Sequence, residues 1–259
     1  MYNGTKIGNK ENGMSARPKT LLTRGNPKIL KGASKGYITF ILHLAPASVS
    51  GYNVCAMATD GCKLACLNTA GRGGIPNSKA VTVTARHGEV TVPNVIQAAR
   101  IAKTVWFFQD RRSFMAQLVK EIAAGIAYAE RQGLIPVFRL NGTSDIRWEA
   151  VEVDGHANIM EMFPTVQFYD YTKLVNRKAL PANYRLTFSL AENNDLAAWA
   201  SGLNVAAVFK GKLPATFMGR PVIDGDETDL RFLDPTGVVV GLKAKGKAKR
   251  DTTGFVRAA

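Results

Sequence analysis

Tyr37-Ile38-Thr39-Phe40-Ile41-Leu42-His43-Leu44 is an apolar run rich in β-branched and aromatic residues. Such a run predicts a buried β-strand, and Pro46 predicts its end because proline cannot donate to a strand ladder. The three cysteines of the chain, Cys55, Cys62 and Cys66, all follow this strand. The sequence therefore predicts that the strand leads into a loop that carries three soft ligands.

The spacing of the cysteines indicates a metal site. Cys62 and Cys66 stand four residues apart, so a helical turn would place both thiols on one face, and the loop could return Cys55 to them. An odd, clustered set of cysteines is a poor disulfide framework. In a reducing compartment such a cluster more often binds metal.

Three interpretations of the thiols stay open. Three cysteines can bind a [4Fe-4S] cluster and leave one iron free for an exogenous ligand. A closed zinc site needs a fourth ligand, for which His43 and His87 are candidates. Zinc sites commonly use two cysteine pairs, so the lone triplet favours the cluster, and a thiol role without metal is the third interpretation.

Composition predicts one soluble domain over residues 21–259, preceded by a flexible basic arm over residues 1–20. With 259 residues, 46% of them apolar, the chain can bury a sizeable core. It lacks both an apolar signal core at the N-terminus and a membrane-spanning run. The net charge of +14 predicts attraction to polyanions, either a small nucleotide-like substrate or, non-specifically, nucleic acid.

Helical spacing of apolar residues predicts two helices, from Asn94 to about Gln109 and from Ser113 to about Gln132, with Asn94 and Ser113 as N-caps. Before them, the alternating segments 80–84 and 89–92 predict a small hairpin.

Short apolar segments alternate with helical ones through the rest of the chain. Predicted strands are Ile135–Leu140, Thr165–Lys173, Tyr184–Asn193, Val205–Lys210 and Val238–Leu242, and predicted helices are Trp148–Met162, Lys173–Ala179 and Asn194–Ser201. This alternation predicts an α/β fold with a parallel sheet, curled as a whole or partial TIM-like barrel.

Polar residues follow the predicted strands, where such folds place their working groups. The candidate cofactor- or substrate-binding residues are Asn141, Ser144, Asp145, Asp170, Ser189, Glu192 and Lys210. A barrel would bring them to one mouth, facing the cysteines. For Asn141, Ser144 and Asp145 a turn with a helix cap is an equally good interpretation. No catalytic residue can be assigned.

An acidic segment, Asp224 to Asp234, stands out in this basic chain. Its carboxylates could bind a cation, but pairing with Arg231 and nearby lysines is the favoured interpretation. The spacing of a calcium loop is absent.

A three-cysteine loop after the first strand of a βα barrel resembles the radical S-adenosylmethionine superfamily, whose usual gaps are three and two residues. Here the gaps are six and three. The resemblance implies a [4Fe-4S] cluster with S-adenosylmethionine as a possible second cofactor.

Several motifs also resemble a bacteriophage family called gene product 88. They are Leu44-Ala45-Pro46, Gly51 to Cys55, Gly61-Cys62 to Arg72, Arg139 to Asp145, and Asp224 to Pro235. The resemblance covers most of the chain and implies a phage protein that acts in the host bacterial cytoplasm.

The leading hypothesis is therefore an iron-sulfur protein with an open iron, acting as a radical S-adenosylmethionine-like enzyme on an unknown substrate. The alternatives are a basic nucleic-acid-associated protein with a structural zinc site, and an electron-transfer protein.

Overall fold

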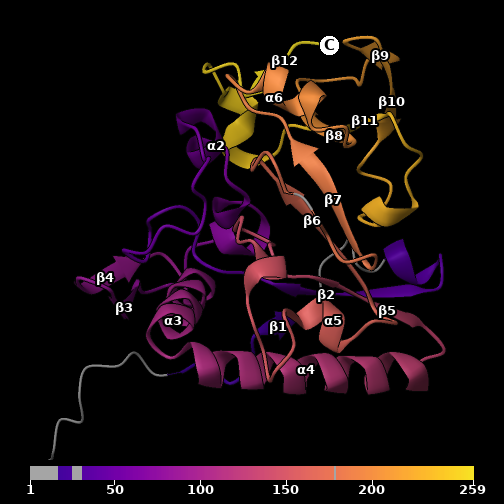
Figure 1. The fold of residues 1–259 in the computed structure, drawn as a ribbon. Helices are drawn as coiled ribbons and strands as arrows, with labels where there is room; N and C mark the ends of the chain where they lie inside the picture. The colour runs from indigo at the N-terminus through magenta and orange to yellow at the C-terminus, as the bar shows by residue number, and fades with distance from the viewer. Residues whose placement is uncertain (1–16, 25–30, 178) are drawn as a thin grey trace, which may run out of the picture.

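The computed structural model describes residues 17–24, 31–177 and 179–259 (Figure 1). The predicted arm over residues 1–20 lies mostly outside these ranges. The described strands are β1 (Leu22–Thr23), β2 (Tyr37–Leu42), β3 (Val81–Ala85), β4 (Gly88–Val92), β5 (Ile135–Arg139), β6 (Gln167–Thr172), β7 (Tyr184–Ser189), β8 (Val205–Phe209), β9 (Thr216–Phe217), β10 (Arg220–Asp224), β11 (Val239–Lys243) and β12 (Val256–Arg257). The α-helices are α2 (Asp60–Leu64), α3 (Val95–Gln109), α4 (Arg111–Arg131), α5 (Ile159–Met162) and α6 (Asp195–Ala200), and the 3₁₀ helices are η1 (Leu67–Thr69), η2 (Gly71–Gly74), η3 (Trp148–Ala150), η4 (Arg231–Leu233) and η5 (Gly246–Arg250).

One ten-stranded sheet organises the chain, in the order β1-β2-β5-β6-β7-β8-β11-β10-β9, with β12 paired to β8. The pairs from β2 through β8 to β11 and β10 are all parallel, so the carboxyl ends of these strands lie at one edge. The chain is thus mixed α/β with a mostly parallel sheet. Within the described ranges no pairing joins the path's ends, β1 and β9, so these strands form no closed barrel, and a partial TIM-like barrel stays a prediction.

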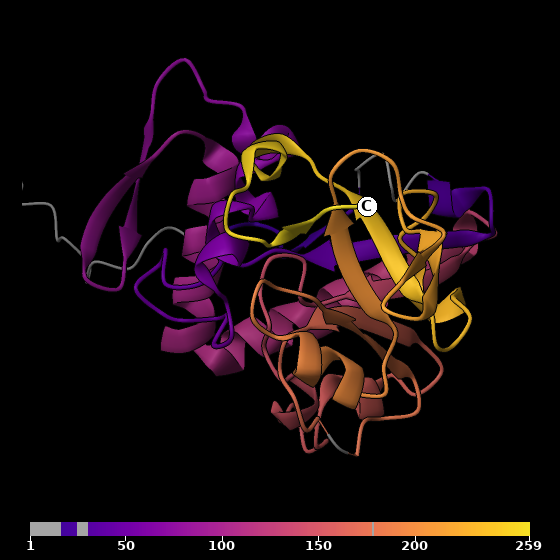
Figure 2. The same ribbon diagram turned by 90° about the horizontal axis from the view of Figure 1, so that it is seen from above.

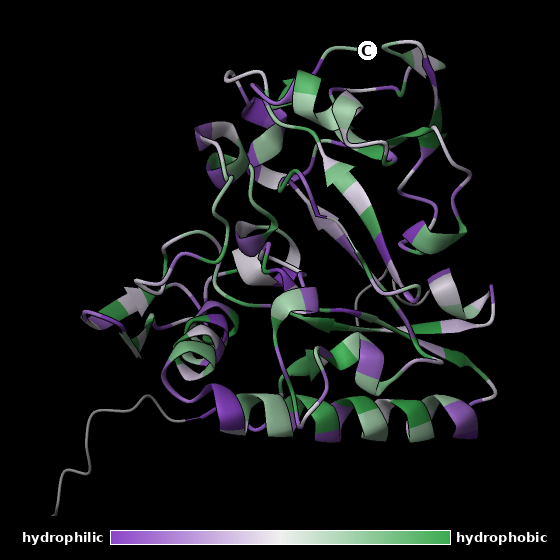
Figure 3. Ribbon diagram, in the orientation of Figure 1, coloured by the Kyte–Doolittle hydropathy of each residue, from purple (hydrophilic) through white to green (hydrophobic). Residues whose placement is uncertain are grey.

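Successive side chains along each strand point to opposite faces of the sheet, and both faces are buried. On one face Phe138 stacks on Phe40 with ring centroids 5.1 Å apart, and α4 packs over both rings. A Cβ on Gly125 of α4 would approach these rings to 3.2–3.3 Å, so the glycine allows the helix to come close. Figure 1 shows α4 running beneath β2 and β5, and the bands of green and purple along it in Figure 3 are those of an amphipathic helix.

The opposite face is covered by the acidic segment. Val137 and Tyr169 pack there against Leu230, next to η4. Arg139 of β5 pairs with Asp229, and both side chains are almost fully buried. The predicted structural pairing of this segment is confirmed by further ion pairs, Arg231–Asp234, Lys243–Asp224 and Lys245–Asp226.

The two long helices and the hairpin are confirmed. Asn94 caps α3 as predicted, because its side chain accepts a hydrogen bond from Gln97 N at 2.9 Å. Ser113 as the cap of the next helix is wrong: Asp110 caps α4, and its carboxylate accepts from Ser113 N at 3.1 Å. In the described parts of the chain, no helix is long and apolar enough to cross a lipid bilayer.

The structure contradicts two predicted helices: one forms only in part, and the other does not form over its described residues. Over Trp148–Met162 only η3 and the four-residue α5 form, because a turn with Asp154 at φ 44° and a bridge between Val153 and His156 interrupt them. Over residues 173–177 the chain is irregular, and Arg177 reaches back to pair with Glu149.

Replacing Asp229 with asparagine is expected to destabilise the fold by about 3–5 kcal/mol, because the Arg139 guanidinium would stay buried without a counter-charge. Urea denaturation measures the loss. The matched control is Asp60→Asn, which breaks an exposed pair with Lys63 and should change the free energy of unfolding little. Equal effects of the two variants would contradict this account.

Candidate functional site

The cysteine loop, residues 53–74, lies above the carboxyl end of β2. Thr59 caps α2, and its hydroxyl oxygen accepts a hydrogen bond from Cys62 N at 3.2 Å. This cap starts a single helical turn, which carries Cys62 and leads directly to Cys66. All three cysteines are free and half-buried.

The three thiols share one electrostatic neighbourhood. The pKa of Cys55 is raised to about 12, mainly by burial, with the charges of Cys66, Asp145 and Cys62 contributing. Burial also raises the pKa of Cys66, with Cys62 adding to the effect and the positive charges of Arg100 and Lys173 opposing it. Cys62 and Cys66 thus lie within electrostatic range of Cys55, and Arg100 and Lys173 lie within range of Cys66.

The structure does not arrange the thiols around a single ion. Among the described residues, no three His, Cys, Asp or Glu side chains are grouped as a metal ion would require. His43 shares a hydrogen bond of 3.3 Å between its Nδ1 and the hydroxyl of Thr23, and burial with nearby cations lowers its pKa to about 3. His87 lies on the β3–β4 turn, close to Gly51. Neither histidine joins the cysteines in a ligand group.

Glu192, which follows β7, anchors one side of the cysteine loop. Its carboxylate accepts from the Thr59 hydroxyl at 2.6 Å and from Gly61 N at 2.8 Å. These bonds fix the first turn of α2, and thereby the backbone of Cys62. Glu192 was predicted to contact a cofactor or substrate; here its carboxylate holds the cysteine loop.

The turn after β5 anchors the other side. Val54 O accepts from Asp145 N at 2.8 Å, and the Cys55 thiol donates to Thr143 O at 3.8 Å. Asp145 also lies close enough to Cys55 for its charge to raise the thiol pKa. Two strand ends, those of β5 and β7, therefore hold the cysteine loop between them.

Residues 251–257 form a C-terminal strap beside the cysteine loop, which Figure 2 shows in yellow next to the purple loop. The strap is tied down by β12, which pairs with β8, and by Arg257, which donates to Ala191 O at 2.6 Å. A Cβ on Gly61 would lie 2.2 Å from the Thr253 hydroxyl and 2.8 Å from Phe255 Cβ. Glycine at position 61 is therefore required for the strap to pack on the loop.

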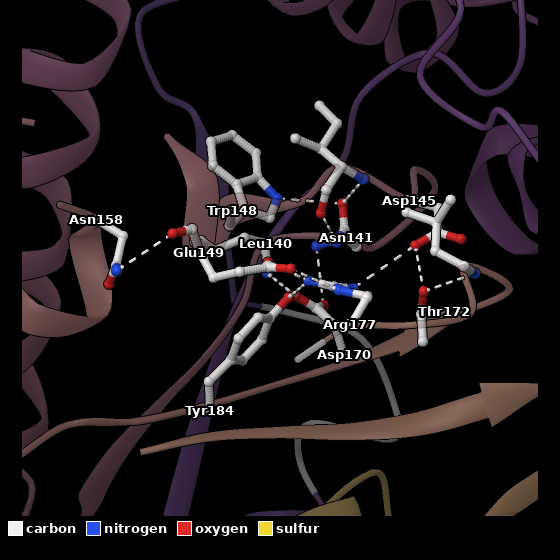
Figure 4. Close-up of polar contacts among 12 residues, drawn as sticks. Leu140, Asn141, Asp145, Trp148, Glu149, Asn158, Asp170, Thr172, Arg177 and Tyr184 are labelled. Atoms are coloured by element: carbon white, nitrogen blue, oxygen red, sulfur yellow. Dashed lines mark hydrogen bonds and ion pairs between the residues drawn. The ribbon is translucent and has the colours of Figure 1, made fainter. Parts of the chain in front are cut away.

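Asn141 is the hub of the turn after β5 (Figure 4). Its Oδ1 accepts from Ser144 Oγ at 2.8 Å, Ile146 N at 2.9 Å and Trp148 Nε1 at 3.1 Å, while its Nδ2 donates to Ile146 O. The polar atoms of Asn141 and the Ser144 hydroxyl thus bond the protein itself. Between the two interpretations of these residues, this geometry favours the turn.

Asp170 of β6 lies under that turn and is fully buried. Its carboxylate accepts from Leu140 N at 3.2 Å, Asn141 N at 2.9 Å and the Tyr184 hydroxyl at 3.0 Å. Burial raises its pKa to about 7, against the opposing effect of Arg139 and these hydrogen bonds. Asp170 is therefore a structural carboxylate that joins β5, β6 and β7.

Asp145 connects this buried network to the cysteine loop. Its carboxylate accepts from the Thr172 hydroxyl at 2.8 Å and from Lys173 N at 2.7 Å, and lies 3.8 Å from Nη1 of Arg177. Burial raises the pKa of Asp145 while these partners lower it. Figure 4 shows these contacts side by side with those of Asp170.

The remaining predicted residues divide between two places. Ser189 accepts from the Lys173 ammonium at 2.7 Å, which places it beside the cation that acts on Cys66. Lys210 lines a separate cavity between the ends of β8 and β11. Of the predicted residues, Asp145, Ser189 and Glu192 therefore lie beside the cysteine loop or the cation next to it, while Lys210 lines a separate cavity.

Sequence reasoning missed Arg100, Lys173 and the strap. Arg100 comes from α3 and donates to Asn68 Oδ1 at 2.7 Å in the cysteine loop. Nothing in the helical pattern of the sequence distinguishes Arg100 from the other cations of the predicted helices. Lys173 could have been found, because it directly follows a strand, as the chosen candidates do.

Comparison with known proteins finds one similarity. A family model described as gene product 88 matches residues 20–259, which include every cysteine and every residue of the site described above. No curated protein and no solved structure matches the chain.

The raised pKa of Asp170 predicts a pH-dependent contribution to stability. Because the folded state binds this proton more tightly than the unfolded chain, the contribution is complete below about pH 4 and decreases by up to about 1.4 kcal/mol per pH unit as pH rises toward 7. Urea denaturation between pH 4 and 7 should therefore show the advantage of the wild type over Asp170→Asn shrinking as pH rises. Asp154→Asn, at an exposed carboxylate, is the control, and an advantage that grows with pH would contradict the prediction.

Gly61→Ala should loosen the strap and cost about 1–3 kcal/mol, because the added methyl group overlaps Thr253 and Phe255. Hydrogen exchange across residues 251–257 is expected to speed up more than exchange in β5. Gly32→Ala is the matched control, since its Cβ would meet no atom closer than 3.4 Å. Unchanged exchange in the strap would show that the contact does not hold it.

Proposed function

We propose that this chain, which belongs to the gene product 88 family, is an iron-sulfur protein whose Cys55, Cys62 and Cys66 bind a [4Fe-4S] cluster and leave one iron open. The observation that carries the proposal is that all three cysteines are free, half-buried and held on one loop at the carboxyl edge of a parallel sheet. The family supports a viral protein made in a host cell, and we place it in the host cytoplasm.

A cluster suits the thiols better than a single ion does. Each thiolate of a cluster binds a different iron, so the ligands stand further apart than the four ligands around one zinc ion. This fits three half-buried thiols that lie on one loop without forming a compact ligand group in the described residues. It also explains why neither histidine is required.

The charges around the thiols also favour an anionic occupant. Three thiolates and their cluster need compensating charge, and Arg100 and Lys173 supply it next to Cys66. Nε of Arg100 is buried and has no hydrogen-bond partner in the described chain. The raised thiol pKa values mean that loading must release protons, which makes loading easier at higher pH.

The residues of the chain have distinct tasks in this site. Glu192 and Thr143 hold the two sides of the cysteine loop, and the strap limits access of water from the side of Gly61. When bound, a cluster of this kind supplies one-electron redox chemistry and an iron that can accept an exogenous ligand. S-adenosylmethionine is our candidate for that ligand, which would make the protein an enzyme; a redox protein without substrate is the alternative.

Protein purified without oxygen is expected to be brown and to contain about four irons and four sulfides per chain. Each of Cys55→Ser, Cys62→Ser and Cys66→Ser should lose most of both, because three ligands are the minimum for the cluster. His43→Gln and His87→Ala are the controls and should retain the iron.

The same preparations separate the alternatives. A colourless protein with one zinc per chain, lost in His43→Gln, would overturn the cluster proposal. Release of 5′-deoxyadenosine from the reduced protein with S-adenosylmethionine would support that cofactor, whereas an intact cluster without release would exclude S-adenosylmethionine alone.

A further inference from the structure

A second charged feature lies between the carboxyl ends of β8 and β11, where the structure has a cavity of about 750 Å³. Its lining includes one carboxylate, Asp226, and five lysines: Lys31, Lys210, Lys243, Lys245 and Lys249. None of these residues belongs to the cysteine site. The volume is within the range of small-molecule binding sites.

The lysines converge through tertiary structure. Because β8 and β11 pair in parallel with Phe209 opposite Lys243, Lys210 and Lys243 emerge side by side at the sheet edge. Lys245 and Lys249 come from the segment around η5, and Lys31 comes from the chain before β2. Three separate segments, around Lys31, around Lys210 and over residues 243–249, therefore contribute ammonium groups to one cavity.

Carboxylates balance only part of this charge. Asp226 pairs with Lys245 at 2.8 Å and Asp224 with Lys243 at 3.4 Å. Within the described chain, no ion pair joins Lys31, Lys210 or Lys249 to a carboxylate. Lys31 instead donates to Asp226 O at 2.9 Å, which holds its ammonium group at the cavity.

We propose that this cavity binds a ligand that carries several adjacent phosphate groups, as a nucleoside triphosphate or a nucleic-acid backbone does. Clustered ammonium groups in a concave site concentrate anions, and lysine binds phosphate as a point charge without the fork geometry that favours arginine at carboxylates. The lysine methylene stems provide apolar walls.

The cavity adjoins the cysteine loop through η5. Gly246, at the start of η5, lies so close to Ala70 of the loop that its Cβ would be 3.6 Å from that of Ala70, and η5 contacts η1. A phosphate ligand bound by Lys249 would therefore contact η5, the segment that also contacts the cysteine loop. The proposal does not depend on a cluster in the neighbouring site.

The test measures binding of three probes to the full chain by isothermal titration calorimetry: inorganic tripolyphosphate, ATP and a single-stranded oligonucleotide. Lys210→Gln and Lys249→Gln should each weaken the binding of the probes that use the cavity by about tenfold, because each variant removes a charge-assisted contact. Lys79→Gln and Lys120→Gln are the charge-matched controls, since both lysines are exposed and lie outside the cavity. Thermal melting confirms that all four variants fold.

The pattern across the probes decides the outcome. If the cavity variants weaken the binding of tripolyphosphate and ATP only, the result would support a nucleotide as the ligand. If they weaken the binding of the oligonucleotide only, it would support a nucleic-acid backbone. Equal weakening by cavity and control variants, or no binding of any probe at low salt, would overturn the proposal, since binding would then follow net charge or be absent.

Discussion

The buried carboxylate of Asp170 is the constraint on which the functional edge of the sheet depends. It accepts two backbone N–H groups of the turn after β5 and the hydroxyl of Tyr184 in β7, so one side chain joins three strands. The turn held in this way places Asn141, and the bonds of Asn141 in turn place Asp145. Leaving a buried hydrogen-bond acceptor without a partner costs more free energy than one hydrogen bond contributes. These contacts therefore stabilise the turn as a unit.

The cysteine loop takes its shape from contacts with residues other than the three cysteines. Glu192, Asp145 and Thr143 belong to the ends of β5 and β7, and each reaches the loop near a cysteine. The strap then covers Gly61 from the C-terminal end of the chain. Preorganisation by such outer contacts is what metal and cluster sites need, because the ligands must lie in position before the group binds.

Much of the secondary structure was predictable. The strand at Tyr37 and the helix capped by Asn94 follow from periodicity and capping, which act over a few residues. Prediction failed from Trp148 to Met162, where a turn and a buried ion pair of Glu149 outweigh helical spacing. It also could not decide whether the sheet closes, because pairing of distant strands depends on long-range contacts.

By itself the sequence determined that three thiols follow a buried strand and that polar groups end the later strands, since residue type and spacing are local properties. Only the tertiary structure decided which polar groups meet the cysteines: Glu192 and Asp145 do, whereas Lys210 joins a different cavity. The tertiary structure also brings the positive charges of Arg100 and Lys173 close to the Cys66 thiol. The physical reason is that the order of parallel strands and the path of the C-terminal strap, rather than distance along the chain, set which charges are neighbours.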